Sequence, residues 1–168
     1  MATTGATGCT FRPAAPSDVT AVAAYHHRCW QRSFAPLLAP GVVAALDPSR
    51  RLDLFRAWFA PGSEVRTVVA DRGGRAIGHT TVGGAELIHL FVDPDHWGGG
   101  LGRALLAIGE AMLAEAGHAE AELHTIVGNE PALALYRSAG WVVTDRLVHN
   151  DSDGLVYDEH VLAKRLAV

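Results

Sequence analysis

The stretch that decides the fold is dense in glycine and lies just past the middle of the chain. It reads His96-Trp97-Gly98-Gly99-Gly100-Leu101-Gly102-Arg103. An apolar run at 87–92 and an Asp-Pro-Asp turn precede it, and a helical apolar repeat follows it. The first N–H groups of such a helix lack internal partners and carry partial positive charge, and glycine lets the backbone approach a ligand closely. The stretch therefore predicts a phosphate-bearing ligand held mainly by main-chain N–H groups.

The remaining hydrophobic and turn patterns predict one α+β domain around this stretch. The expected elements are a strand at 9–12, helices at 17–30 and 49–59, strands at 65–70, 76–82 and 86–92, a helix at 101–116, a strand at 120–127, a helix at 131–139, and strands at 141–148 and 155–162. Ser17 is expected to cap the first helix. Residues 1–8 are small and polar and are predicted to be disordered, so that the domain covers residues 9–168.

Composition excludes several classes of protein. The chain has 14 Lys and Arg against 18 Asp and Glu, a formal charge of −4, which does not favour nucleic acid as a partner. No apolar stretch reaches the roughly 20 residues of a membrane span, and the N-terminus has no secretory pattern, so we expect a cytoplasmic protein that does not bind membranes. The two cysteines predict free thiols, and the nine histidines have no metal-site spacing, so no metal is expected.

The glycine stretch does not fit the two best-known phosphate-binding patterns. The dinucleotide pattern G-x-G-x-x-G fails because Arg103 or Leu105 stands at its last position, and the Walker pattern fails because no Lys-Ser/Thr pair follows the glycines. A plain flexible turn is the alternative without a ligand, but such a turn does not require four glycines within five residues at a helix start.

The stretch resembles the acyl-CoA-binding motif [QR]-x-x-G-x-[GA] of the GNAT (GCN5-related N-acetyltransferase) superfamily. Trp97 stands where that family usually has Gln or Arg, so a polar side-chain contact is lost while the backbone cradle remains. The resemblance implies a mixed, mostly antiparallel sheet of six to seven strands flanked by about four helices. It also implies acetyl-CoA as cosubstrate, with pantetheine on the main chain of Leu90, Phe91 and Val92. The pyrophosphate would lie on Trp97, Gly98, Gly99, Gly100, Leu101, Gly102 and Arg103.

A second segment, 129–141, resembles the family signature N-x-x-A-x-x-L-Y-x-x-x-G-[FW]. Seven residues are close to two helical turns, so Asn129 and Tyr136 are expected on one face, beside the glycine stretch. A phenol there can protonate a leaving thiolate, and Tyr136 is the predicted general acid, with a core tyrosine as the alternative. The resemblance implies that Asn129 binds the coenzyme arm, and a simple helix cap is the alternative.

The general base is less well determined by the sequence. Glu86 opens the strand before the glycine stretch and matches the position of a glutamate base in histone-acetylating members of the family. A carboxylate there could accept the proton directly or through water, and a solvated strand-end glutamate is the alternative. His89 has odd parity relative to Glu86, so a regular strand places it on the other face, whereas a bulge would reverse this. His79 and His124 are equally ambiguous.

Together these patterns predict an acetyl-CoA-dependent N-acetyltransferase that acts by direct transfer. The acceptor would be a primary amine of a small molecule or a peptide, and aromatic residues between 25 and 62 are candidates for its binding wall. The alternative is a non-catalytic module with a GNAT fold that binds or senses acyl-CoA. The sequence leaves open whether the protein is a monomer or a homodimer.

Overall fold

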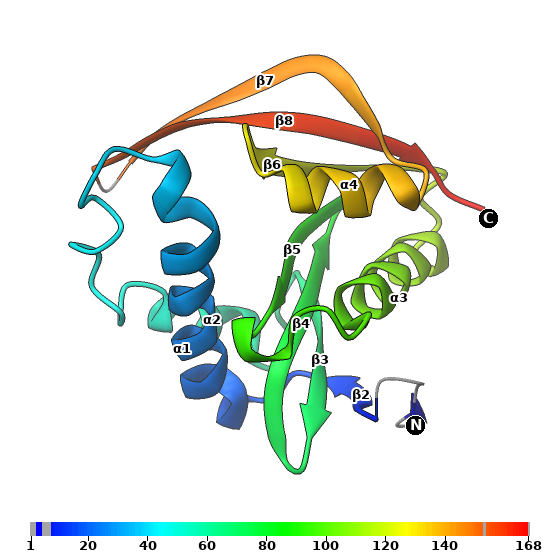
Figure 1. Cartoon of the computed structure of the whole chain (residues 1–168). Coiled ribbons are helices and arrows are strands. Elements are labelled where there is room, and N and C mark those ends of the chain that lie inside the picture. The colour runs from blue at the N-terminus through cyan, green and yellow to red at the C-terminus, as the bar shows by residue number, and fades with distance from the viewer. Residues whose placement is uncertain (1–2, 5–7, 153, 168) are drawn as a thin grey trace.

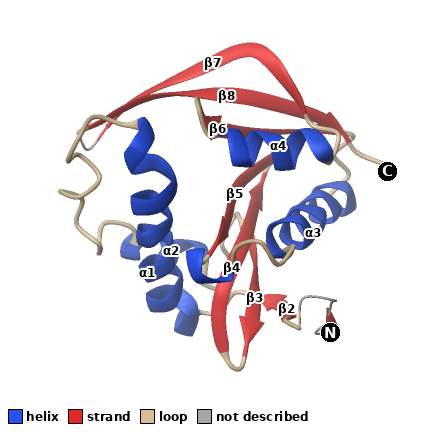
Figure 2. Ribbon diagram, in the orientation of Figure 1, coloured by secondary structure: helices blue, strands red, loops and turns tan. Residues whose placement is uncertain are grey.

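The computed structural model describes residues 3–4, 8–152 and 154–167 (Figures 1 and 2). The strands are β1 (Thr3–Thr4), β2 (Thr10–Pro13), β3 (Arg66–Arg72), β4 (Arg75–Gly83), β5 (Glu86–Val92), β6 (Glu120–Ile126), β7 (Val142–Ser152) and β8 (Leu155–Arg165). The α-helices are α1 (Val19–Cys29), α2 (Leu52–Trp58), α3 (Leu101–Glu115) and α4 (Glu130–Ser138). This order confirms the predicted succession of elements. In the range expected to be disordered, residues 1–2 and 5–7 lie outside the described residues, and Thr3–Thr4 pairs with β2.

All the strands of the described chain form one sheet, in the order β1-β2-β3-β4-β5-β6-β8-β7. Neighbouring strands are antiparallel except β5 and β6, which are parallel. The predicted mixed, mostly antiparallel sheet flanked by about four helices is therefore confirmed, and the two-residue β1 brings the expected six to seven strands to eight in the described chain.

The helices cover opposite faces of the sheet (Figure 1). Helices α1 and α2 pack Val22, Tyr25 and Phe55 against one face. Helix α3 packs on the other face next to α4, in a cluster that includes Leu106 and Leu133. These two apolar layers fix the sheet between the helices, and we call its two sides the α1 face and the α3 face.

The start of α1 differs from the prediction. A 3-10 turn at Pro16–Asp18 precedes the helix, so Ser17 lies within this turn and does not cap α1. The Asp18 carboxylate instead accepts a 2.8 Å hydrogen bond from the Ala15 N–H and pairs with Arg12. Arg12 also reaches Asp71 at the end of β3, so a partly buried ion-pair cluster holds the turn from which this helix begins.

Strands β5 and β6 diverge in the middle of the sheet. Their pairing is confined to Glu86 with Glu122 and Leu87 with Leu123. From Ile88 onward, the side of β5 that faces β6 has no strand partner among the described residues, and Figure 2 shows the two strands separating. The sheet therefore contains an open backbone edge of about five residues in its interior.

A bulge in β5 decides which side chains face α1. The register with β4 shifts at Thr81/Val82, so that Leu87 pairs with Val82 and His89 pairs with Thr81. A shift by one residue moves all later side chains to the other face. Leu87 packs in the α3-face cluster and Phe91 packs with α1, so His89 also faces α1. The bulge reverses the orientation that a regular strand predicts for His89.

Candidate active site

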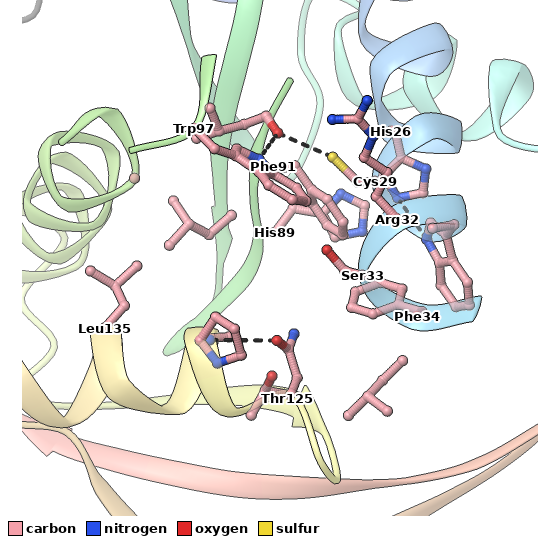
Figure 3. Close-up of a pocket in the computed structure, with 18 of the residues that line it drawn as sticks. His26, Cys29, Arg32, Ser33, Phe34, His89, Phe91, Trp97, Thr125 and Leu135 are labelled. Carbon is pink, nitrogen blue, oxygen red and sulfur yellow. Dashed lines mark hydrogen bonds between the residues drawn. The ribbon is translucent and has the colours of Figure 1, made fainter. Parts of the chain in front are cut away.

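A cavity of about 710 Å³ opens where β5 and β6 diverge. Its walls come from α1 and the π-helical turn that follows it, the free part of β5, the glycine stretch, the end of β6, the start of α4, and β8. Figure 3 shows side chains from α1, the π-helical turn, β5, the glycine stretch, β6 and α4 around the cavity. Segments separated by more than a hundred residues in the sequence therefore form one site.

The glycine stretch borders this cavity at the start of α3. Gly98 and Gly100 have φ values of +80° and +77°, a conformation that favours glycine, and Gly100 is the N-cap of α3. Residues 98–103 donate no backbone hydrogen bond among the described residues, and the first regular helix bond is from Ala104 to Gly100. Several N–H groups are therefore free to bind one anion, as the sequence predicts.

The open edge of β5 ends at a carbonyl group with two donors. The Trp97 indole N–H donates to the Val92 oxygen at 2.8 Å, and the Cys29 thiol donates to the same oxygen at 3.1 Å. The two side chains come from the two sides of the cavity (Figure 3). Trp97 is the residue that departs from the sequence motif. Its indole N–H thus occupies the Val92 carbonyl, to which a pairing strand would otherwise donate a hydrogen bond.

Asn129 and Tyr136 both line the cavity from α4. Asn129 is the N-cap of this helix, and its side-chain oxygen accepts a long 3.5 Å bond from the Ala132 N–H. The Tyr136 hydroxyl has no hydrogen-bond partner among the described residues, although the side chain is only 7% exposed. Burial raises the pKa of this phenol, so it remains protonated at neutral pH, as a general acid requires.

Three of the predicted site residues do not line the cavity. Gly99 lies within the glycine stretch but does not face inward, and the Arg103 guanidinium bonds the Ser138 hydroxyl at 2.8 Å on the exposed surface of α4. Glu86 lies at the start of β5, where the strand still pairs with β6. The role of Glu86 as base stays a prediction, and from this position the carboxylate would need a connecting water. The other predicted coenzyme-binding residues line the cavity.

The α1 face of the sheet carries a row of three histidines, of which His26 and His79 are buried and His89 is half-buried. The Tyr25 hydroxyl lies 2.7 Å from His79 Nδ1, and His79 Nε2 lies 3.3 Å from His89 Nδ1. The His89 ring stacks on His26 with centroids 5.3 Å apart, and both line the cavity. Burial lowers the pKa of His79 to about 3 and that of His26 and His89 well below the usual value near 6.5. All three are neutral at physiological pH.

Glu159 is a second polar residue on the α1 face, and it was not singled out from the sequence. Glu159 on β8 lines the cavity, and its Oε2 accepts a 3.0 Å bond from the Asn150 amide. His124 Nδ1 lies 4.0 Å from the same oxygen. Burial raises the pKa of Glu159. No local sequence motif indicates the pairing of His124 with Glu159, because only the register of β6 with β8 brings the two side chains together.

The described part of the chain holds neither a metal-binding cluster nor a membrane-spanning helix. Within it, no group of three or more His, Cys, Asp or Glu side chains is placed to hold a metal ion. Across residues 3–4, 8–152 and 154–167, no helix has the length and apolar character needed to cross a bilayer.

Comparison with known families identifies the class to which this fold and cavity belong. The model of the acetyltransferase (GNAT) family matches residues 22–141, which run from within α1 to just past α4 and include every wall of the cavity except β8. The chain therefore belongs to the GNAT acetyltransferase family.

Curated relatives within the family carry one recurring name. A mycothiol acetyltransferase from Clavibacter sepedonicus is 46% identical over 114 residues, which cover 66% of this chain and 36% of that protein. A mycothiol acetyltransferase from Kocuria rhizophila is 34% identical over 120 residues, covering 66% and 39%. The matching region thus spans little more than a third of the length of these relatives.

Solved structures share the fold over nearly the whole chain. A GCN5-related N-acetyltransferase from Rhodopseudomonas palustris superposes with a TM-score of 0.78 at 19% identity, covering 99% of this chain and 98% of that one. The PaiA N-acetyltransferase from Thermoplasma acidophilum, solved in complex with coenzyme A, has a TM-score of 0.75 at 15% identity and covers 94% and 98%. At these identities the likeness supports the fold alone.

Proposed function

We propose that this protein is an acetyl-CoA-dependent N-acetyltransferase that transfers the acetyl group directly to a primary amine. The observation that carries the proposal is the meeting of three features in one cavity: the open edge of β5, the free N–H groups at the start of α3, and the protonated phenol of Tyr136. A family fold alone would not define an activity, because function depends on the site.

The cavity fits the parts of coenzyme A in order. The free N–H groups at residues 98–103 would hold the pyrophosphate, with the partial positive charge of α3 behind them. The main chain of Leu90, Phe91 and Val92 would pair with the two amides of the pantetheine arm, because an extended chain with alternating donors and acceptors completes an open edge. Acetyl-CoA supplies an acetyl group already activated as a thioester.

The residues of the chain then supply orientation and protons. Free β5 N–H groups would polarise the thioester carbonyl, which develops negative charge when the amine attacks. Tyr136 would donate its proton to the sulfur as the carbon–sulfur bond breaks. Both cysteines are buried, and burial raises the pKa of the Cys29 thiol to about 12, so this cysteine is a poor nucleophile and direct transfer is favoured over an acyl-enzyme.

The test is the Tyr136→Phe variant, assayed by thiol release from acetyl-CoA across a panel of amines. We expect kcat to fall about 100-fold, because a positioned general acid contributes on this order. Calorimetry should show an unchanged Kd for acetyl-CoA, since the phenyl ring remains in place. Undiminished turnover would remove Tyr136 as the acid. Tight acetyl-CoA binding without thiol release from any amine would instead indicate a binding or sensing module.

The name of the curated relatives suggests one specific acceptor to include. Mycothiol-related amines belong in the panel because proteins named mycothiol acetyltransferase are 34–46% identical to this chain over 114–120 residues. Turnover with such an amine at a kcat/KM above that of the other amines would extend the acceptor assignment to this chain.

A further inference from the structure

The α1 face of the cavity combines apolar side chains with a histidine and a carboxylate. Ile126 packs with Trp30 and Leu155 in a buried cluster, which places the even-numbered side chains of β6 on this face. Glu159 is the register partner of Ile126, so the Glu159 side chain lies on the same face. His124, two residues before Ile126, joins it there. Two strands, β6 and β8, and the π-helical turn after α1 thus contribute side chains to this face.

Aromatic rings form the apolar part of this wall. The Trp30 ring meets Phe34 at 4.7 Å and Tyr157 at 5.9 Å between centroids, both nearly edge to face. The guanidinium of Arg50 lies over the Trp30 ring, 5.5 Å from its centroid. One face of Trp30 therefore already has a cation, and the three rings offer a ligand an apolar surface more than a second cation–π site.

The wall carries more positive than negative side chains. Arg32 and Arg51 line the cavity, and Glu159 is the only carboxylate among its described lining residues. The Asn150 amide holds Glu159 Oε2, while Oε1 accepts no hydrogen bond within the described chain. The Glu159 side chain is only 20% exposed, so a cation bound there would meet a carboxylate that water screens weakly.

We propose that the His124–Glu159 pair is the acceptor ammonium site, which selects a primary amine carried on an apolar or aromatic group. Glu159 binds the ammonium through its free oxygen, and the group that bears the amine packs against Trp30, Phe34 and Tyr157. His124 then takes a proton from the nitrogen. This inference rests on the proposed transferase function, and it names the acceptor class and the base for that function.

The proposed reaction takes two protons from the ammonium nitrogen and returns one to the sulfur. The ammonium gives one proton to His124, and the free amine attacks the thioester carbon as the carbon–sulfur bond breaks. The departing sulfur gains a proton from Tyr136, and the second proton that the nitrogen loses in forming the amide restores the Tyr136 phenol through water. The net products are the amide, the free thiol and one proton. His124 is 26% exposed at its side chain, so it can release that proton to water.

The chain contains a matched control pair that faces outward. His149 Nδ1 lies 2.8 Å from Asp158 Oδ1, and both side chains are more than half exposed. Asp158 directly precedes Glu159 on β8 and therefore faces the other side. The substitutions Asp158→Asn and His149→Gln thus remove a carboxylate from β8 and an imidazole from the adjacent strand β7, at side chains that do not line the cavity.

The experiment measures steady-state kinetics with benzylamine as the apolar probe and glucosamine as a polar one. In the wild type we expect kcat/KM for benzylamine to exceed that for glucosamine at least about tenfold. Glu159→Gln should raise KM for benzylamine about tenfold or more, and Asn150→Ala should raise it less, because the carboxylate stays but loses its support. His124→Gln should lower kcat about 100-fold. Both control variants should stay within about twofold of wild type.

Each outcome decides a separate point. Calorimetry with acetyl-CoA should give the wild-type Kd for every variant, which shows that each is folded. A KM within about twofold of wild type in both Glu159→Gln and Asn150→Ala would overturn the ammonium site. A greater loss of kcat in Glu86→Gln than in His124→Gln would overturn the base, and a preference for glucosamine would overturn the acceptor class. No thiol release with any amine, despite acetyl-CoA binding, would instead refute the proposed function itself.

Discussion

The two walls of the cavity are built in opposite ways. The wall of the glycine stretch relies on main-chain groups: free N–H groups at residues 98–103 and the open edge of β5. The α1 face relies on side chains, including neutral histidines, three aromatic rings and Glu159. A main-chain wall tolerates side-chain changes and can serve any ligand with the same backbone-like amides. A side-chain wall can differ from one acceptor to another. We therefore expect the main-chain wall to bind a shared cosubstrate and the side-chain wall to bind a specific acceptor.

The largest effect should come from breaking the main-chain wall. Replacing Gly98 and Gly100 together by alanine forces two L-residues into positive φ, at a cost of about 1 kcal/mol or more for each. We expect the acetyl-CoA Kd, measured by calorimetry, to rise at least about tenfold. Gly99→Ala is the control, because no atom lies within 4 Å of its added methyl group and its φ is not positive. Equal Kd values for the two variants would contradict a main-chain cradle.

The side-chain wall should respond to acid. His79 is neutral in the folded state, with a pKa of about 3, whereas an unfolded histidine titrates near 6.5. Below pH 6.5 the unfolded chain binds more protons, so stability is full above that pH and is lost as the pH falls. For one such histidine the loss is about 1.4 kcal/mol per pH unit. Urea unfolding at pH 7.5 and 5.5 should show a decrease of at least about 1 kcal/mol.

A double variant makes this acid response specific. Tyr25→Phe with His79→Leu removes the titrating ring together with the hydroxyl that bonds it, so Tyr25 leaves no unpaired hydroxyl, and only the 3.3 Å contact to His89 is lost in addition. The fall in unfolding free energy between the two pH values should become shallower, while His26 and His89 retain their share. An unchanged pH dependence would mean that His79 does not carry the effect.

The smallest effect concerns Trp97, where the two walls meet. Trp97→Phe keeps an aromatic ring but removes the N–H that occupies the Val92 carbonyl. If the pantetheine arm pairs with this carbonyl, coenzyme A should bind about threefold more tightly to the variant. The reason is that an amide N–H of the arm would no longer compete with the indole N–H for the Val92 oxygen. ADP, which has no pantetheine arm, should bind equally to both proteins in the same calorimetric titration. A gain for both ligands would refute the pairing.

The sequence predicted the main-chain wall well and the side-chain wall poorly. The glycine stretch and the segment from Asn129 to Tyr136 are each local, so spacing alone places them on a helix start and a helix face. Glu159 and His124 lie 35 positions apart, and only the β6–β8 register makes them neighbours. The orientation of His89 depended on a bulge that parity arguments treat as an exception. Ser17 failed as a cap because Asp18 forms a better, non-local contact with Arg12.

The gap between β5 and β6 also bears on how the protein avoids aggregation. An unpaired strand edge at the rim of a sheet is a template for strands of other molecules. Here the unpaired stretch lies inside the sheet, with paired strands on both sides and helices over both faces. The open edge of β5 faces the cavity rather than the outer rim of the sheet. The protein can therefore keep an edge permanently open and still remain a poor template for self-association.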